Sequence, residues 1–381
     1  MKLKEVCENI TDGSHNPPSG IDSSEYLMLS SKNVFDDKIT LEEPRYLSEE
    51  QFLAEDKRTC IKAGDVLMTI VGTVGRAAVV TADIPKITLQ RSVAVLHPHS
   101  DVCNSRFLMY LLQSKKNFFE QEAHGVAQKG IYLKQLSEIS VSIPAISQQE
   151  DIVDKLDRIN KIIKSRQLEL DKLDELIKAR FVELFGDPRI NPLGYDTKKL
   201  GKTCTVITGN TPSRKVPEYY GDYMEWIKTD NIVSGVLNPT EAAECLSEAG
   251  VNEGRYVDEN AILMACIAGS IASIGRVCVT DRRVAFNQQI NAIVPEEYNT
   301  LFLYILLQIS KDYLVEDINM ALKGILSKSK LEEKVFIVPP MELQNQFAEF
   351  VKQVDKSKVA VQKSLDETQK LFDSLMQEYF G

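Results

Sequence analysis

The chain has 381 residues, of which 43% are hydrophobic and 26% are charged, a composition typical of a folded protein of two or three domains. Its formal net charge is −10, which argues against a protein that holds nucleic acid through bulk positive charge alone. No run of 18 apolar residues is present, and the start MKLKEVCENITDG lacks the apolar core of a signal peptide, so we expect a cytoplasmic protein with no membrane partner.

The first 146 residues predict a mostly β region with short helices. A polar, proline-rich loop occupies residues 12–20. The apolar run at 65–71 turns through Gly72 and Gly75 into a second apolar run, which is typical of buried strands joined by glycine turns. Asn104 precedes the apolar segment SRFLMYLLQ and is placed to cap a short helix.

The region 187–341 repeats this order of elements. Its proline-rich loop at 209–221 corresponds to the first loop, and Asn299 stands before the apolar segment TLFLYILLQ as Asn104 stands before its own. The segment Leu89-Gln90-Arg91 aligns with Asn287-Gln288-Gln289. An internal repeat of this length predicts two copies of one domain.

Two long amphipathic helices are predicted at 147–186 and 342–381, one after each copy of the repeat. Apolar residues at alternating steps of four and three define a heptad seam in both, and a shift of 195 residues relates the two seams. Arg166, Lys358 and Thr368 interrupt the seams, and such polar residues lower stability while fixing register. At 1.5 Å per residue each helix is about 57 Å long. The seam residues through which we expect the helices to pack on each other are Ile152, Leu156, Ile159, Ile163, Leu170, Leu173, Ile177, Phe347, Val351, Val354, Val361, Leu365, Phe372 and Leu375.

The residue patterns do not form a catalytic constellation. The seven cysteines are scattered singly, which predicts reduced thiols. His97-Pro98-His99 resembles a metal-ligand pair but lacks a carboxylate or cysteine at ligand spacing, and neither a P-loop nor a G-x-G-x-x-G fingerprint is present. Asn16-Pro17-Pro18-Ser19 is similar to the Asn/Asp-Pro-Pro-aromatic tetrad of amino-methyltransferases, except that serine replaces the aromatic residue. We therefore expect a chain without metal, cofactor or catalytic site.

Polar side chains suited to reading DNA gather in the loops of both repeats. Arg and Lys match guanine edges, Asn and Gln match adenine edges, and Ser and Thr match either. Each such residue also has a structural alternative, such as solvating a turn or satisfying buried backbone. The candidate DNA-binding residues are Ser14, His15, Asn16, Arg76, Arg91, Lys129, Thr211, Ser213, Arg214, Lys215, Lys228, Arg276, Asn287, Gln288, Gln289 and Lys323.

This arrangement resembles the specificity (S) subunit of type I restriction-modification enzymes over essentially the whole chain. The motifs that carry the resemblance are the loop ITGNTPSRKVPEYYG followed by EWIKTDNI, the turn GSIASIGR, the segment NQQI, and the helix starts IPAISQQEDIV and VPPMELQNQFA. The first repeat departs from the family in its loop, where GSHNPPSG replaces the G-x-T-P-S form.

The resemblance implies an α+β fold with two mostly-β target recognition domains, 1–146 and 187–341. They are separated by two long helices, 147–186 and 342–381, that form an antiparallel coiled coil. Each domain would read half of a bipartite, asymmetric site in double-stranded DNA, and the helices would set the gap and hold two methyltransferase subunits. Those subunits would carry S-adenosylmethionine, and a restriction subunit using ATP and magnesium would be a further partner. The alternatives are a coiled-coil scaffold without a DNA role and a stand-alone DNA-modifying enzyme.

Overall fold

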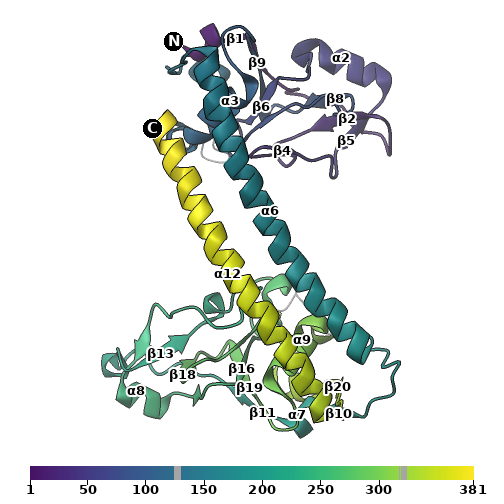
Figure 1. Cartoon of the computed structure of the whole chain (residues 1–381), viewed down its shortest axis with the longest axis vertical. Helices are drawn as coiled ribbons and strands as arrows, with labels where there is room; N and C mark the ends of the chain where they lie inside the picture. The colour runs from purple at the N-terminus through teal and green to yellow at the C-terminus, as the bar shows by residue number, and fades with distance from the viewer. Residues whose placement is uncertain (124–129, 317, 319–323) are drawn as a thin grey trace. The chain divides into compact units, whose positions relative to one another are not determined.

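The computed structural model describes residues 1–123, 130–316, 318 and 324–381. They form two compact units (Figure 1). Unit 1 contains Met1–Ser165 and Leu365–Gly381, and unit 2 contains Arg166–Ser364. Each unit therefore combines one copy of the sequence repeat with part of each long helix. Among the described residues, no helix is long and apolar enough to cross a membrane.

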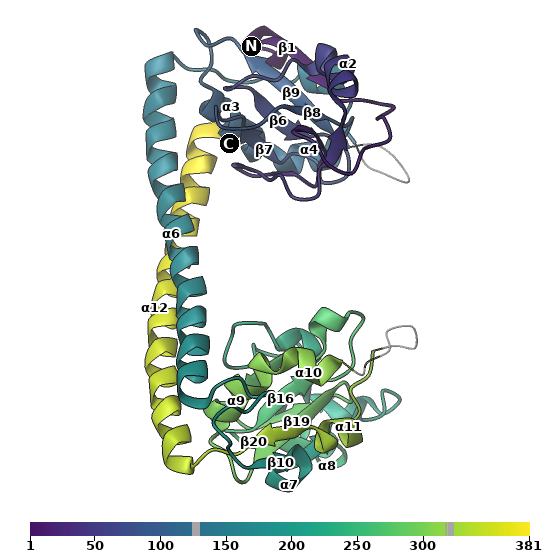
Figure 2. The same ribbon diagram turned by 90° about the vertical axis from the view of Figure 1, so that its right-hand side faces the viewer.

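Unit 1 is built on a four-stranded antiparallel sheet in the order β1-β9-β6-β7. A smaller sheet, β5-β2-β8, pairs β2 with β8 in parallel, and β3 forms a hairpin with β4. Strands β6 and β9 are buried on both faces, because one face packs on α3 and the other on the smaller sheet (Figure 2). The strands are β1 (Cys7–Asp12), β2 (Tyr26–Leu29), β3 (Val34–Phe35), β4 (Lys38–Ile39), β5 (Arg45–Leu47), β6 (Val66–Thr69), β7 (Ala77–Val79), β8 (Ile87–Leu89) and β9 (Val93–Pro98), and the short helices are α1 (Leu3–Val6), α2 (Glu49–Thr59), α3 (Ser105–Ser114), α4 (Lys116–Glu122) and α5 (Leu133–Ser137).

Unit 2 repeats this plan with the sheet β11-β19-β16-β17 and a second sheet, β12-β14-β13-β18-β15, while β10 pairs with β20. Its strands are β10 (Thr197–Lys199), β11 (Cys204–Thr208), β12 (Tyr220–Gly221), β13 (Met224–Ile227), β14 (Cys245–Leu246), β15 (Tyr256–Val257), β16 (Ile262–Ala265), β17 (Val277–Val279), β18 (Val284–Phe286), β19 (Ile290–Pro295) and β20 (Val335–Ile337). Its short helices are α7 (Leu200–Thr203), η1 (Pro217–Tyr219), η2 (Thr229–Asn231), α8 (Glu248–Glu253), η3 (Ile271–Ser273), α9 (Thr300–Ile309), α10 (Lys311–Val315) and α11 (Lys328–Glu333).

The strand register corrects the sequence alignment of the two repeats. Gln90 N donates to the carbonyl of Leu29 at 2.8 Å, and Asn287 N donates to the carbonyl of Ile227 at 3.0 Å. Gln90 therefore corresponds to Asn287, and Arg91 to Gln288. The alignment of Leu89-Gln90-Arg91 with Asn287-Gln288-Gln289 was wrong by one residue. It followed the similarity of the polar turn residues, whereas the buried strand end fixes the register.

Asparagine caps the helix that follows the main sheet in both units. The side chain of Asn104 accepts from the first-turn amides of α3, and that of Asn299 accepts from those of α9. Each cap satisfies amide groups that have no partner within the helix. The sequence prediction of a capped helix at each place is confirmed.

The long helices run antiparallel, as the resemblance implied. They are α6 (Ile146–Phe185) and α12 (Met341–Phe380). In unit 1 Leu156, in an early turn of α6, shares a core with Phe380 at the end of α12. In unit 2 Phe185, at the end of α6, shares a core with Phe347 near the start of α12. Every seam residue named above is buried or half-buried, and most positions between them are exposed.

Polar residues in the seam bond to the facing helix. The guanidinium of Arg166 donates to the carbonyl of Ser364, and Lys358 Nζ lies 2.7 Å from the carboxylate of Asp174. A cation at a half-buried seam position is tolerated when it is paired in this way, and the pairing favours one register of the two helices.

A buried glutamine fastens the first turn of each long helix to the repeat that precedes it. Gln149 is fully buried, and Gln344 is 1% exposed. In both, Oε1 accepts from the backbone N–H of the capping asparagine, Asn104 at 2.8 Å or Asn299 at 2.9 Å. In both, Nε2 donates to the carbonyl of the proline five residues earlier, at 2.8 Å. We call this pair of contacts the glutamine latch.

We predict that Gln344→Ala lowers the free energy of unfolding of unit 2 by about 3 kcal/mol, because it leaves two backbone groups unpaired and opens a cavity. Urea unfolding monitored by the fluorescence of Trp226, the single tryptophan of the chain, measures this change in free energy, because Trp226 lies in unit 2. Gln346→Ala, at an exposed position of the same helix, is the matched control and should change the free energy by less than about 0.5 kcal/mol. Equal effects of the two substitutions would argue against the latch.

Candidate nucleic-acid interface

In each unit a loop crosses a turn at the edge of the main sheet. The loop follows β1 or β11, and the turn joins β8 to β9 or β18 to β19. A Cβ placed on Gly13 would lie 2.1 Å from the carbonyl oxygen of Leu89, and one on Gly209 would lie 2.1 Å from that of Asn287. Only glycine allows so close an approach of two backbones. We call the two resulting surfaces loop–turn site 1 (residues 13–20 and 90–92) and loop–turn site 2 (residues 209–216 and 287–289).

Loop–turn site 2 brings together several of the predicted DNA-binding residues. The indole N–H of Trp226 and the hydroxyl of Tyr220 donate to carbonyls of the loop at 3.3 and 2.7 Å, which fixes its backbone. The hydroxyl of Thr211 donates to the amide oxygen of Gln288 in the turn. Ser213 and Lys215 are exposed in the same loop. The site thus presents hydroxyl, amide and ammonium groups on a fixed backbone.

Arg214 and Lys228 share one carboxylate. The guanidinium of Arg214 lies 4.2 Å from the ring centre of Tyr220 and 5.2 Å from that of Trp226, and it binds Glu244 at 2.8 Å. Lys228 binds the same carboxylate. Hydrogen bonds from Arg214 and then Lys228 lower the pKa of Glu244 to about 2, so the carboxylate is ionised at any ordinary pH. Glu244 therefore neutralises part of the positive charge that the two cations present.

The remaining turn residues of site 2 bond to each other. Asn287 is buried, its Oδ1 accepts from the backbone N–H of Gln289 at 3.0 Å, and its Nδ2 donates to the side-chain oxygen of Gln289 at 3.2 Å. These contacts shape the turn and leave Gln288 as its exposed side chain.

Loop–turn site 1 is organised around the buried carboxylate of Asp12. His15 Nε2 lies 2.8 Å from Asp12 Oδ2, and Arg58 binds the other carboxylate oxygen. Asp12, His15 and Arg91 line a pocket of about 230 Å³ together with Tyr132, which is 68% exposed. The site differs from its counterpart in charge and shape, since it has an imidazole and a guanidinium where site 2 has a threonine and a glutamine.

The other predicted residues of the first loop differ in exposure. Ser14 is buried, and its backbone N–H donates to the carbonyl of Leu89 at 2.7 Å. Asn16 is exposed next to His15. Lys129 and Lys323, which the sequence also suggested, lie outside the residues that the structure describes.

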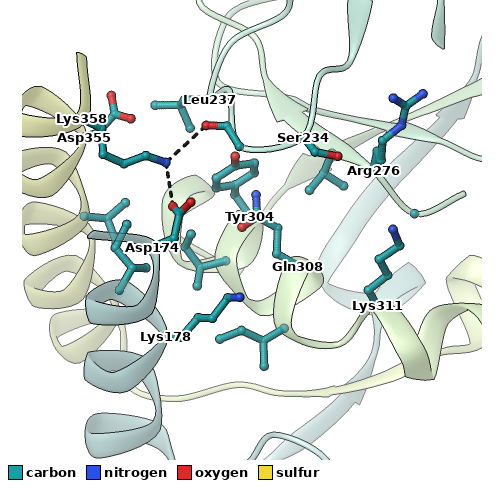
Figure 3. A pocket seen from close by; sticks show the side chains of 17 residues that line it. Asp174, Lys178, Ser234, Leu237, Arg276, Tyr304, Gln308, Lys311, Asp355 and Lys358 are labelled. Atoms are coloured by element: carbon teal, nitrogen blue, oxygen red, sulfur yellow. Dashed lines mark hydrogen bonds and ion pairs between the residues drawn. The ribbon is translucent and has the colours of Figure 1, made fainter. Parts of the chain in front are cut away.

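Arg76 and Arg276 lie outside the loop–turn sites. The guanidinium of Arg276 donates to the carbonyls of Ser273 and Thr229 at 3.3 and 3.1 Å. It lines a cleft of about 240 Å³ in unit 2, where Lys358 also binds Asp174 (Figure 3). The guanidinium of Arg76 lies 5.0 Å from the ring centre of Phe35. Both arginines support turns and loops in these positions.

Cys266 and His97, which lie outside the loop–turn sites, have raised pKa values. Burial raises the pKa of the Cys266 thiol to about 12, and all seven cysteines are free. The Nδ1 atom of His97 lies 2.8 Å from Asp65, and this hydrogen bond raises the pKa of the imidazole. No three metal-binding side chains come together in the described part of the chain.

Sequence analysis missed residues whose role depends on distant partners. Gln149 and Gln344 stand at the same shift of 195 residues as the two seams, so the repeat itself could have identified them. Glu244 carries no such signal, because its role follows from two cations in separate segments. Asp37, which is discussed below, was missed for the same reason.

Sequence comparisons place both repeats in one family. The family model for the type I restriction modification DNA specificity domain matches residues 1–174 and 192–368. The type I restriction enzyme HindI specificity subunit of Haemophilus influenzae is 30% identical over 161 residues, which is 41% of this chain and 34% of the relative. The EcoBI specificity subunit of Escherichia coli is 31% identical over 129 residues, 33% of this chain and 27% of the relative. The chain thus spans about a third of the length of these two relatives.

A longer but weaker match covers most of the chain. The MjaIX specificity subunit of Methanocaldococcus jannaschii is 21% identical over 340 residues, 82% of this chain and 76% of the relative.

Solved structures share the fold. The S subunit of a type I restriction-modification system from M. genitalium has a TM-score of 0.59 at 14% identity and covers 100% of this chain and 95% of its own. A structure described as the basis of complex assembly and conformational transition of the type I R-M system has a TM-score of 0.54 at 16% identity, covering 100% and 96%. Since the family model matches both repeats, the chain belongs to the type I restriction-modification DNA specificity family.

Proposed function

We propose that this chain is the DNA-specificity subunit of a type I restriction-modification complex and reads a bipartite, asymmetric target. The observation that carries the proposal is the structural repeat, in which one strand order builds two loop–turn sites with different side chains. Arg91 stands where Gln288 stands in the other unit, and these two types favour guanine and adenine edges respectively. Two copies of one recognition domain that expose different side chains are expected to recognise two different half-sites.

The proposed partners are double-stranded DNA, two methyltransferase subunits and, in the complete complex, restriction subunits. Exposed apolar side chains on the long helices, Ile162, Leu176, Val359 and Leu371, each more than 40% exposed, support a protein partner at these surfaces. S-adenosylmethionine would lie on the methyltransferase subunits, and ATP and magnesium on the restriction subunits, so this chain would itself be non-catalytic and would act with the DNA in the cytoplasm. An acidic chain suits such an assembly, because partners then supply part of the positive charge around the DNA.

The test is a single-molecule methylation map of the source genome with and without the gene. We expect deletion to remove one adenine-methylated motif, made of two short blocks around a fixed gap. Re-expression of the chain should restore it. An unchanged map in a strain whose methyltransferase subunit is expressed would overturn the proposal.

Gln288→Ala should weaken recognition of one half-site only. Loss of one bidentate contact corresponds to about 1–3 kcal/mol of discrimination, or roughly 5- to 150-fold in relative rate. Methylation rates of the assembled complex on duplexes with single base-pair changes in either half measure this. Arg91→Ala, at the corresponding position of unit 1, is the reciprocal variant and should relax the other half-site. If both variants relax the same half-site, readout is not divided between the units.

Glu244→Gln should strengthen DNA binding by the complex, because it frees Arg214 and Lys228 for phosphate. We expect the affinity for DNA to rise about three- to tenfold at roughly 0.1 M salt. The slope of log affinity against log salt concentration should become steeper by about one. Fluorescence anisotropy with a labelled duplex at several salt concentrations measures both. Glu342→Gln removes the same charge at an exposed position of α12 and should leave affinity unchanged. Weaker binding by Glu244→Gln would indicate that Glu244 orders the two cations for DNA.

A further inference from the structure

The hairpin of β3 and β4 has an aspartate where the backbone favours glycine. Asp37 has a φ of 55°, in the left-handed region. In unit 2 the corresponding residue is Gly235, with a φ of 79°. Each stands four residues after an asparagine, Asn33 or Asn231, whose side chain donates to a nearby carbonyl at 2.9 Å. A residue with a Cβ is disfavoured in this conformation, so the presence of aspartate calls for a role of its side chain.

The side chain of Asp37 reaches two helices. Its Oδ1 accepts from Arg106 Nη1 of α3 at 2.9 Å, and its Oδ2 accepts from Asn160 Nδ2 of α6 at 3.1 Å and from Lys164 Nζ. The side chain is only 14% exposed. Burial alone would raise the pKa of Asp37, but the hydrogen bonds from Lys164 and Arg106 outweigh it and the pKa is lowered. The hairpin tip is therefore bonded to the long helix as an ion.

Polar contacts between this domain and α6 are spread along the helix. The glutamine latch lies at Gln149, and the Asp37 contact lies at Asn160 and Lys164. Fifteen residues of helix separate Gln149 from Lys164, which is about 22 Å. Between them Arg106 binds Asp157 at 2.6 Å. The latch holds the domain at one end of this span and the Asp37 contact holds it at the other, so together they oppose a change of angle between the domain and the helix.

Unit 2 reaches the same arrangement with different residues. Lys358 Nζ donates to the carbonyl of Gly235 at 3.3 Å and to Asp174 at 2.7 Å (Figure 3). Lys358 lies 14 residues after Gln344, about 21 Å along α12. The tip of the β3–β4 hairpin in unit 1 and the turn at Gly235 in unit 2 thus contact the helices at a similar distance from the latch. In unit 1 the hairpin supplies the side chain, and in unit 2 the helix does.

We propose that Asp37 and Lys358 are distal tethers, which fix the angle of each recognition domain on the helices and thereby limit the gap between half-sites that the complex accepts. This inference rests on the proposed function. Both are positioning residues, because they act through the domain that they hold and lie outside the loop–turn sites. Loss of a tether should therefore alter the range of gap lengths that the complex accepts. It should have a smaller effect on the stability of the unit and on base preference.

Asp37→Gly is the decisive variant, because it installs the residue that unit 2 has and relieves the left-handed backbone while it removes the tether. The matched control is Glu43→Gly. Glu43 is an exposed carboxylate of the same unit with a φ of 46°, so the control makes the same change of charge and backbone. Both variants should melt within about 3 °C of the wild type.

The readout is methylation by the assembled complex of duplexes whose two blocks are separated by the native gap or by one base pair more or fewer. We expect Asp37→Gly to reduce the preference for the native gap at least fivefold, with Glu43→Gly like the wild type. Unchanged gap preference in Asp37→Gly, or the same loss in Glu43→Gly, would overturn the tether.

A second measurement does not depend on the function. Hydrogen exchange of the free chain should be faster in Asp37→Gly at residues 33–40 and 157–164, and unchanged in Glu43→Gly. If the wild-type complex methylates no bipartite DNA, the proposed function fails, while this exchange result still supports or refutes the tether.

Discussion

Burial of the apolar stripe of α6 against that of α12 is the interaction on which both units depend. Each long helix has 40 residues and one apolar face, and most of the stability of such a helix in a protein comes from packing of that face. In unit 2 the ring centre of Phe185 lies 4.8 Å from that of Phe302 in α9 and 5.5 Å from that of Phe347 in α12. In unit 1 the ring centre of Phe380 lies 5.2 Å from that of Phe107 in α3. Helix pair and recognition domain therefore share one core, and neither is a separate module.

Periodicity and repetition made the framework predictable. The heptad seams and the caps Asn104 and Asn299 follow from spacing and from residue type, because burial of an apolar stripe and capping of a helix are local requirements. The antiparallel pairing of the helices was expected only from the resemblance to the family. The alignment of the two β-turns, which pairs Gln90 with Asn287, was not predictable to one residue. The sequence does not show which buried strand residue each turn follows, and polar turn residues resemble one another. The domain boundaries expected at 146 and 341 remain predictions, because the two compact units divide both helices between them.

The candidate site was predictable in its composition but not in its electrostatics. Sequence placed Thr211, Gln288 and Arg214 among the candidate readers, and the structure gathers them in one surface. The sequence could not indicate that Glu244 binds Arg214 and Lys228, since these three residues come from separate segments. In an acidic chain each exposed cation tends to meet a carboxylate first. The number of cations in a loop is therefore a poor guide to the positive charge that the loop presents.

The repeat also separates what the two units share from what differs between them. The latch residue is glutamine in both, and its partners are backbone groups, an amide and a proline carbonyl, which substitution cannot remove. The tether is made by aspartate in one unit and by lysine in the other, because its partners in unit 1 are side chains that can change together with it. Arg91 and Gln288 also differ between the units, and Gln288 keeps one contact within the chain, with the hydroxyl of Thr211. Constraint on a side chain thus decreases as its partners change from backbone groups to other side chains, which explains how two copies of one fold keep the same latch and differ in their tethers and exposed loop residues.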